Sequence, residues 1–132
     1  MQGLQEIWGL NHKETSWATA GYLGAIESGQ TTCGLLIGCS VAIGLKFGQG
    51  KECLPMEDTD ERDKAVTEVN KLYHAFLKEF ESTECQILTT CDFSKPEELT
   101  RYVEKEIYKD CCFKFFNFVM NRFIEMDKKE KT

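Results

Sequence analysis

The strongest structural signal in this chain is a helical repeat of apolar residues between positions 61 and 81. Apolar side chains recur there at intervals of three or four residues, at Val66, Val69, Tyr73, Phe76 and Phe80, with Leu72 and Leu77 alongside. This spacing places one apolar stripe along an α-helix, and such a stripe is buried in a folded domain. Asp60 precedes the repeat and can cap the helix. We therefore expect a long core helix over residues 61–81.

Other segments repeat the same period, and no segment has the alternation or length of a β-strand. Helical spacing covers residues 13–27 and 31–47, and it returns from Ser94 to about residue 126, with a break near Lys109-Asp110. Ser94 and Glu97 flank Pro96 in a capping-box pattern, which predicts a helix start there. The sequence predicts an all-α fold, a compact bundle of about four to five helices.

The length indicates a single domain. A chain of 132 residues buries about two-thirds of its unfolded surface and needs neither a disulfide nor a metal to fold. We expect one helical domain over residues 1–132, with residues 1–12 as an N-terminal arm or short helix. The charged tail, residues 127–132, is expected to fray.

Charge and hydropathy argue against two classes of partner. The net charge of −6 gives no general attraction to nucleic acid or to an anionic membrane surface. The most apolar stretch, residues 33–45, is shorter than the roughly 20 residues that cross a bilayer. No basic segment followed by an apolar one opens the chain. We expect a soluble cytoplasmic protein without nucleic-acid or membrane partners.

Seven cysteines are many for such a protein, and an odd number does not fit a fully paired disulfide framework. In a reducing compartment these thiols are free, bound to metal or reversibly oxidised. Cys53 lies in a loop over residues 48–60, and we treat it as incidental.

Cys33 has the best case for chemistry. Thr31 or Thr32 can cap the next helix, which puts Cys33 at its first or second position. Free amides and the positive end of the helix dipole would stabilise a thiolate there and lower the pKa. An equally weighted alternative is a small buried residue that lets helices pack. Cys39 lies about 240° further round the helix, so we expect it in the core.

The glycines of this helix have a simpler explanation. Gly34, Gly38 and Ala42 lie four residues apart and form a stripe almost without side chains. Such a stripe allows another backbone to approach closely, although each glycine costs about 1 kcal/mol of helix propensity. Tight helix packing explains it.

The remaining cysteines give no recognised metal motif. No Cys-x-x-Cys pair and no His-Glu-x-x-His motif occurs, which disfavours structural zinc and covalent haem. Cys85 and Cys91 share a short turn-rich element over residues 84–93, and Cys111 and Cys112 are adjacent. Four thiolates drawn from Cys33, these two and the adjacent pair could still hold an iron-sulfur cluster or another metal.

The order and spacing of these cysteines resemble a known family. Thr-Cys-Gly-x-x-x-Gly stands at 32–38, Cys-x-x-Leu at 85–88, Cys-Asp-Phe at 91–93, and a late cysteine follows. The pattern is similar to the small redox-active family known as C_GCAxxG_C_C over about residues 15–125. It is more distantly similar to the helical part of split-Soret cytochromes, whose haem-attachment motif is absent here.

The resemblance assigns motif positions residue by residue. The motif cysteine and glycine correspond to Cys33 and Gly34, and its final glycine corresponds to Gly38. The middle cysteine of the family corresponds to Cys85, and the last one to Cys111 or Cys112. Cys91 matches a cysteine present in part of the family.

Two departures from the family pattern are visible. Leu35 replaces the motif alanine, and residues 17–20, Trp-Ala-Thr-Ala, lack the cysteine that many members carry in the first helix. The resemblance implies a redox role that rests on the cysteines.

Three functions follow as alternatives. The first is a thiol-based redox protein, with Cys33 as the reactive thiolate, Cys85 or Cys91 as its resolving partner, and a redox partner that the sequence does not identify. The second is a carrier of a metal or iron-sulfur cluster on the same cysteines. The third is a non-catalytic interaction module, a homodimer whose interface uses the glycine stripe and the aromatic last helix.

Overall fold

The computed structural model of the chain describes residues 2–10 and 13–132. Regular structure within these ranges is helical apart from one isolated β-bridge, which confirms the all-α prediction. The helices are α1 (Gln2–Ile7), α2 (Lys13–Ala20), α3 (Tyr22–Glu27), α4 (Gly34–Gly48), α5 (Thr59–Phe80), α6 (Cys85–Thr89), α7 (Pro96–Glu104), α8 (Ile107–Asp110) and α9 (Cys112–Glu130). The expected N-terminal arm contains α1, while residues 11 and 12 lie outside the described ranges.

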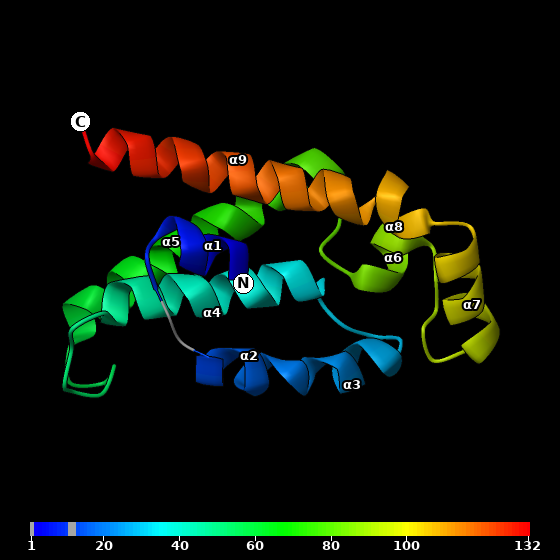
Figure 1. Cartoon of the computed structure of the whole chain (residues 1–132), viewed down its shortest axis with the longest axis horizontal. Coiled ribbons are helices and arrows are strands. Elements are labelled where there is room, and N and C mark those ends of the chain that lie inside the picture. Colours follow the sequence, from blue (N-terminus) through cyan, green and yellow to red (C-terminus); the bar gives the residue numbers. More distant parts are fainter. Residues whose placement is uncertain (1, 11–12) are drawn as a thin grey trace.

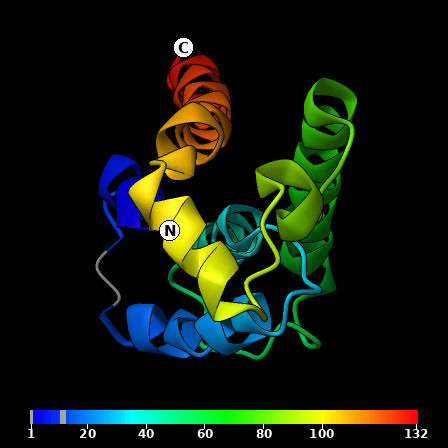
Figure 2. The same cartoon turned by 90° about the vertical axis from the view of Figure 1, so that its right-hand side faces the viewer.

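Helix α4 lies at the centre of the molecule. Figure 1 shows α4, α5 and α9 running lengthwise, with α2 and α3 beneath α4 and the short helices α6, α7 and α8 gathered at one end. Figure 2 looks along the bundle from that end and shows α4 surrounded by α5, α9, α1 and the α2–α3 layer. This arrangement buries both sides of the most apolar helix.

The core forms where the apolar faces of these helices meet. Fully buried side chains come from α4, α5, α9 and α1, namely Leu36, Cys39, Ala42, Ile43, Leu72, Phe76, Phe115, Val119, Phe123 and Leu4. The ring of Phe76 lies 5.5 Å from that of Phe115, in the edge-to-face arrangement that aromatic pairs favour. Cys39 is 1% exposed, which confirms its predicted place in the core.

The long helix α5 differs from the prediction in its capping residue and in the burial of two side chains. It begins after Asp58, whose carboxylate accepts a hydrogen bond of 3.2 Å from the backbone N–H of Glu61, so the cap is not Asp60. Val66 and Leu77 are 59% and 47% exposed, against the expectation that they share the buried face. Val66 instead borders a surface hollow beneath the loop that precedes α5.

The C-terminal half of the chain differs from the prediction at one helix start and has one additional break, while the break expected near Lys109-Asp110 falls at the next residue. Ser94 does not cap α7, because its hydroxyl donates to Asp92 at 2.5 Å and Lys95 occupies the N-cap position. The helix ends at Glu104, and Glu106 adopts a left-handed conformation with φ 50°. A second break falls at Cys111, so α8 is a single turn, and α9 then continues to Glu130, into the tail expected to fray.

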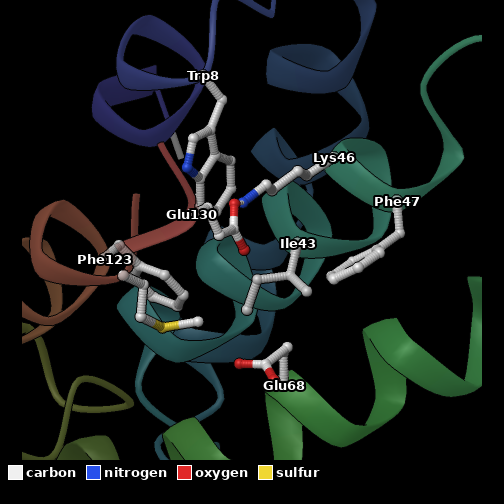
Figure 3. A pocket seen from close by; sticks show the side chains of 8 residues that line it. Trp8, Ile43, Lys46, Phe47, Glu68, Phe123 and Glu130 are labelled. Atoms are coloured by element: carbon white, nitrogen blue, oxygen red, sulfur yellow. Dashed lines mark hydrogen bonds and ion pairs between the residues drawn. The ribbon is translucent and has the colours of Figure 1, made fainter. Parts of the chain in front are cut away.

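The far end of the bundle is closed by contacts around Trp8. Figure 3 shows Trp8, the residue after α1, beside Lys46 of α4 and Glu130 of α9, and the ammonium of Lys46 lies 2.8 Å from Glu130 and 4.9 Å from the indole ring centroid. The Trp8 and Phe123 rings meet edge to face at 5.5 Å. The remaining space, about 10 Å³, holds no more than one water molecule, so this end is a packing contact.

No helix in the described ranges combines the length and the apolar character needed to cross a membrane.

Two leucines of α5 provide a matched test of this packing. We expect Leu72→Ala, at a fully buried site, to lower the free energy of unfolding by about 3 kcal/mol. Leu77→Ala, one and a half turns further along and half exposed, is expected to cost about 1 kcal/mol or less. Urea unfolding followed by circular dichroism measures both, and equal losses would contradict the described burial of α5.

Candidate functional site

The site begins at a single antiparallel β-bridge between Thr32 and Glu84. The backbone N–H of Cys33 donates to the carbonyl of Thr83 at 2.7 Å, and that of Cys85 donates to the carbonyl of Thr31 at 2.9 Å. These two hydrogen bonds join the segment before α4 to the segment before α6. In this antiparallel pairing Cys33 is opposite Thr83 and Cys85 is opposite Thr31. Residues that flank a bridged pair point away from the face of the bridged side chains, so Cys33 and Cys85 lie diagonally across the bridge on the same face.

Neighbouring contacts hold this pairing in place. The phenol of Tyr22 in α3 hydrogen-bonds to the hydroxyl of Thr31 and donates to the carbonyl of Thr32 at 2.7 Å. Gly29, in the turn before the bridge, has φ 83° and lies directly against the side chains of Asp92 and Ser94. The turn after α3 is therefore fixed both to the bridge and to the connector that leads into α7.

The paired cysteines border a cavity of about 420 Å³. Cys33, Cys85 and Cys112 line it, so the N-cap of α4 and the first residues of α6 and α9 each contribute one thiol. The rest of its wall is mostly aliphatic and aromatic, with Leu23, Ile26, Phe93, Leu99, Tyr102 and Phe115. Among the described residues, Glu27 is the one charged side chain on the wall, and it is exposed. The cavity suits apolar or uncharged ligands.

Close packing beside this cavity explains the motif glycine that follows Cys33. A Cβ atom built on Gly34 would lie 3.0 Å from the Cδ1 atom of Ile26 in α3. Gly38, one turn further along, is buried. The glycine stripe therefore serves helix packing, as the sequence indicates, at least where α3 crosses α4.

Cys111 and Cys112 lie at the junction of α8 and α9. Their sulfur atoms are 3.9 Å apart. The thiol of Cys111 donates to the carbonyl of Ile107 at 3.0 Å, and the sulfur of Cys112 is 3.0 Å from the phenol oxygen of Tyr102. Both cysteines are partly exposed, and only Cys112 reaches the cavity wall.

Cys91 is close to this group but is held differently. It is fully buried, its thiol donates to the carbonyl of Thr89 at 3.4 Å, and Nη2 of Arg101 lies 3.3 Å from its sulfur. Arg101 also forms an ion pair of 2.8 Å with Glu98. Burial raises the pKa of Cys91 and outweighs the lowering effect of the Arg101 charge. Cys91 does not line the cavity.

Burial controls the ionisation of Cys33 as well. The backbone amides of Leu35 and Leu36 lower its pKa, as expected for a helix start, although no side-chain capping hydrogen bond forms. Burial has the larger effect and raises the pKa of Cys33 above its ordinary value. The prediction of a lowered pKa is wrong, because it considered the local helix end without the apolar wall around it. Cys33 occupies the N-cap position, just before the first helical residue.

The other thiols follow the same rule. Burial, together with the nearby Cys33 and Cys112 thiols, raises the pKa of Cys85 to about 12. Burial and its neighbour Cys112 raise the pKa of Cys111 to about 11. Burial and the hydrogen bond with Cys112 also raise the pKa of the Tyr102 phenol. At neutral pH, Cys33, Cys85, Cys91 and Cys111 are uncharged thiols.

The arrangement does not provide a ready set of metal ligands. Within residues 2–10 and 13–132, no three His, Cys, Asp or Glu side chains are gathered so that they could hold one ion. The described residues therefore give no support to the iron-sulfur cluster or other thiolate-bound metal considered as an alternative, which stays a prediction.

Of the five cysteines predicted as site residues, three share the cavity wall, and Cys91 and Cys111 lie close behind it. Sequence reasoning missed Tyr102 and Arg101, which contact Cys112 and Cys91. Their positions in α7 resemble those of ordinary surface residues of an amphipathic helix. No local signal marks them, because their partners come from other elements.

The raised pKa values lead to a pH prediction. We expect the alkylation rate of Cys85 by iodoacetamide to rise about tenfold per pH unit from pH 7 to 9, and that of Cys33 to keep rising over the same range, because only the thiolate reacts. Timed alkylation with peptide mass spectrometry measures both rates. In urea at pH 8 the rate of Cys85 is expected to rise by more than about 100-fold, as its pKa returns towards the ordinary value. A plateau below pH 8 in the folded protein would contradict the raised values.

Two glycines test the turn that supports the bridge. Gly29→Ala is expected to lower the free energy of unfolding by about 1–2 kcal/mol, because φ is positive and a Cβ atom would overlap Asp92. Gly24→Ala, in α3 with nothing within 4 Å of the new Cβ atom, is expected to raise it by about 0.5–1 kcal/mol. Urea titration gives both signs, and a neutral Gly29→Ala would show that this contact does not hold the turn.

Comparisons with known proteins give one result. No curated protein matches the chain, and neither does any solved structure. A family profile, described as "Putative redox-active protein (C_GCAxxG_C_C)", matches residues 1–126 of the 132. Because the match spans nearly the whole sequence and includes the five site cysteines, the chain belongs to the C_GCAxxG_C_C family.

Proposed function

We propose that this protein is a thiol-based redox protein in which Cys33 and Cys85 form a reversible disulfide. The β-bridge carries the proposal, since it fixes both cysteines on one face of the paired segments and at the wall of one cavity. Cys85 is the preferred partner over Cys91, because Cys91 is fully buried, contacts Arg101 and Thr89, and is absent from the cavity wall.

The roles of the two thiols follow from their surroundings. Cys33 is the attacking thiol, since the amides of Leu35 and Leu36 stabilise its anion in part. The thiolate of Cys33 attacks one sulfur of an external disulfide, forming a mixed disulfide and releasing one thiol. Cys85 then attacks the sulfur of Cys33 and releases the second thiol. One external disulfide is reduced to two thiols, and two cysteines are oxidised to one disulfide.

The apolar cavity is compatible with both end states of this two-electron chemistry, and it slows the attack because only the thiolate reacts. A charged thiolate is costly in such surroundings, whereas the dithiol and the disulfide are both uncharged. The site therefore stabilises the two end states more than the anionic intermediate between them. Seven cysteines cannot all pair within one chain, which supports placing the protein in a reducing compartment such as the cytoplasm.

The alternative role in protein interaction has one supporting observation. Several large apolar side chains outside the core are exposed, among them Trp17 at 82%, Val103 at 55% and Phe113 at 53%. These residues could contact a redox partner or a second copy of the chain. The homodimer stays a prediction.

Oxidation of the whole protein tests the disulfide. After treatment with 2-hydroxyethyl disulfide, an uncharged probe, we expect one intramolecular crosslink between Cys33 and Cys85 in trypsin digests. Cys33→Ser and Cys85→Ser are each expected to abolish it, because each removes one of the two sulfur atoms. Cys53→Ser, in the exposed loop before α5, is the matched control and is expected to leave the crosslink unchanged.

Two results would contradict this assignment. A crosslink that persists in Cys85→Ser and disappears in Cys91→Ser would make Cys91 the resolving residue. Full alkylation of Cys33 and Cys85 after oxidant treatment, with native circular dichroism retained, would remove the disulfide itself.

A further inference from the structure

The adjacent cysteines at the α8–α9 junction are not explained by the Cys33–Cys85 pair. Their sulfur atoms are already 3.9 Å apart, and Cys111 lies at a helix break with φ −116° and ψ −60°. A helical interior would fix the direction of both side chains, whereas this junction holds them next to each other. The thiol contact and the break occur at the same residue.

We propose that Cys111 and Cys112 form a second redox centre, which takes up a disulfide from an external low-molecular-mass disulfide and passes it to Cys33 and Cys85. The transfer step rests on the proposed function of those two residues. Cys112 connects the two centres because it lines the same cavity as Cys33 and Cys85. Cys111 is partly exposed and does not line the cavity, so it borders the outer side of the junction.

The direction of transfer follows from covalent geometry. Neighbouring Cα atoms are about 3.8 Å apart, which is less than the roughly 4.4–6.8 Å usual in disulfides. A disulfide between adjacent residues is therefore strained, and strained disulfides are the more readily reduced ones. A bond between Cys33 and Cys85 has no such restriction from adjacency. Oxidising equivalents are expected to move from the adjacent pair to the cavity pair.

Each step balances. An external disulfide is reduced to two thiols while Cys111 and Cys112 are oxidised to one disulfide. The thiolate of Cys33 then attacks the sulfur of Cys112, the bond between Cys111 and Cys112 breaks, and Cys111 leaves and takes up a proton. Cys85 next attacks the sulfur of Cys33 and releases Cys112 as a thiol. The adjacent pair is reduced again, and the Cys33–Cys85 disulfide remains.

The sequence makes the adjacent pair easy to follow. Trypsin cleaves after Lys109 and Lys114, which releases residues 110–114 with both thiols in one short peptide. The full chain is mixed with 2-hydroxyethyl disulfide, quenched in acid at successive times, alkylated and digested. We expect peptide 110–114 to lose both free thiols first, and to regain them as the Cys33–Cys85 crosslink appears.

Variants separate the transfer from direct oxidation. Cys111→Ser keeps a donor for the Ile107 carbonyl and is expected to slow formation of the Cys33–Cys85 crosslink about tenfold or more. Cys111→Ala, checked by circular dichroism, repeats the measurement without that donor. In Cys33→Ser the oxidised form of peptide 110–114 is expected to accumulate, while Cys53→Ser serves as the matched control and behaves as the unmodified chain.

Two results would overturn the inference: peptide 110–114 staying reduced throughout, or Cys111→Ser forming the crosslink at the unmodified rate. If peptide 110–114 oxidises and the Cys33–Cys85 crosslink never forms, that result would instead overturn the proposed function. The two failures are therefore distinguishable in one experiment.

Discussion

Two backbone hydrogen bonds, from Cys33 to Thr83 and from Cys85 to Thr31, join parts of the chain that are separated by the whole of α4 and α5. Both helices that start beside this bridge, α4 and α6, begin at or next to a cysteine. Because the bonds are between main-chain atoms, the pairing does not depend on which side chains flank it. The bridge thus acts as a fixed support, and the thiols, the cavity and the turn at Gly29 are arranged on it.

The chemistry of the site is set by a competition between a local and a tertiary effect. The start of α4 offers amide groups that favour a thiolate at Cys33, while the apolar wall formed by α3, α7 and α9 disfavours it. The wall has the larger effect. Reactive cysteines in many redox proteins owe their low pKa to exposed helix ends or basic neighbours. Among the described residues, the one basic side chain that contacts a site cysteine is Arg101, which lies against Cys91 and does not reach the cavity wall.

Much of the fold could be predicted from the sequence because helical periodicity is a local property. The long helix, the central helix and the core position of Cys39 all follow from spacing along a single element. Details that depend on competing neighbours could not be predicted. Asp58 and Asp60 are both good capping residues, and which of them caps α5 depends on where the preceding loop ends. Ser94 matches a capping box, but its hydroxyl donates a hydrogen bond to the carboxylate of Asp92 and does not cap α7.

Three of the five predicted cysteines, Cys33, Cys85 and Cys112, line one cavity, and the sequence did not predict the geometry that brings them there. The bridge that brings Cys33 to Cys85 leaves no trace in either segment alone, and the raised pKa of Cys33 requires knowledge of what packs on α4.

The two ends of the bundle differ in how tightly their helices are held, and this difference affects access to the thiols. At the far end, Trp8, Lys46 and Glu130 hold α1, α4 and α9 together. At the thiol end, α3, α7 and α8 contain no fully buried residue, yet α3 and α7 supply much of the cavity wall. Segments with few buried contacts open locally at a free-energy cost well below that of global unfolding. The cavity can therefore exchange its contents through fluctuations of these short helices while the long helices stay folded.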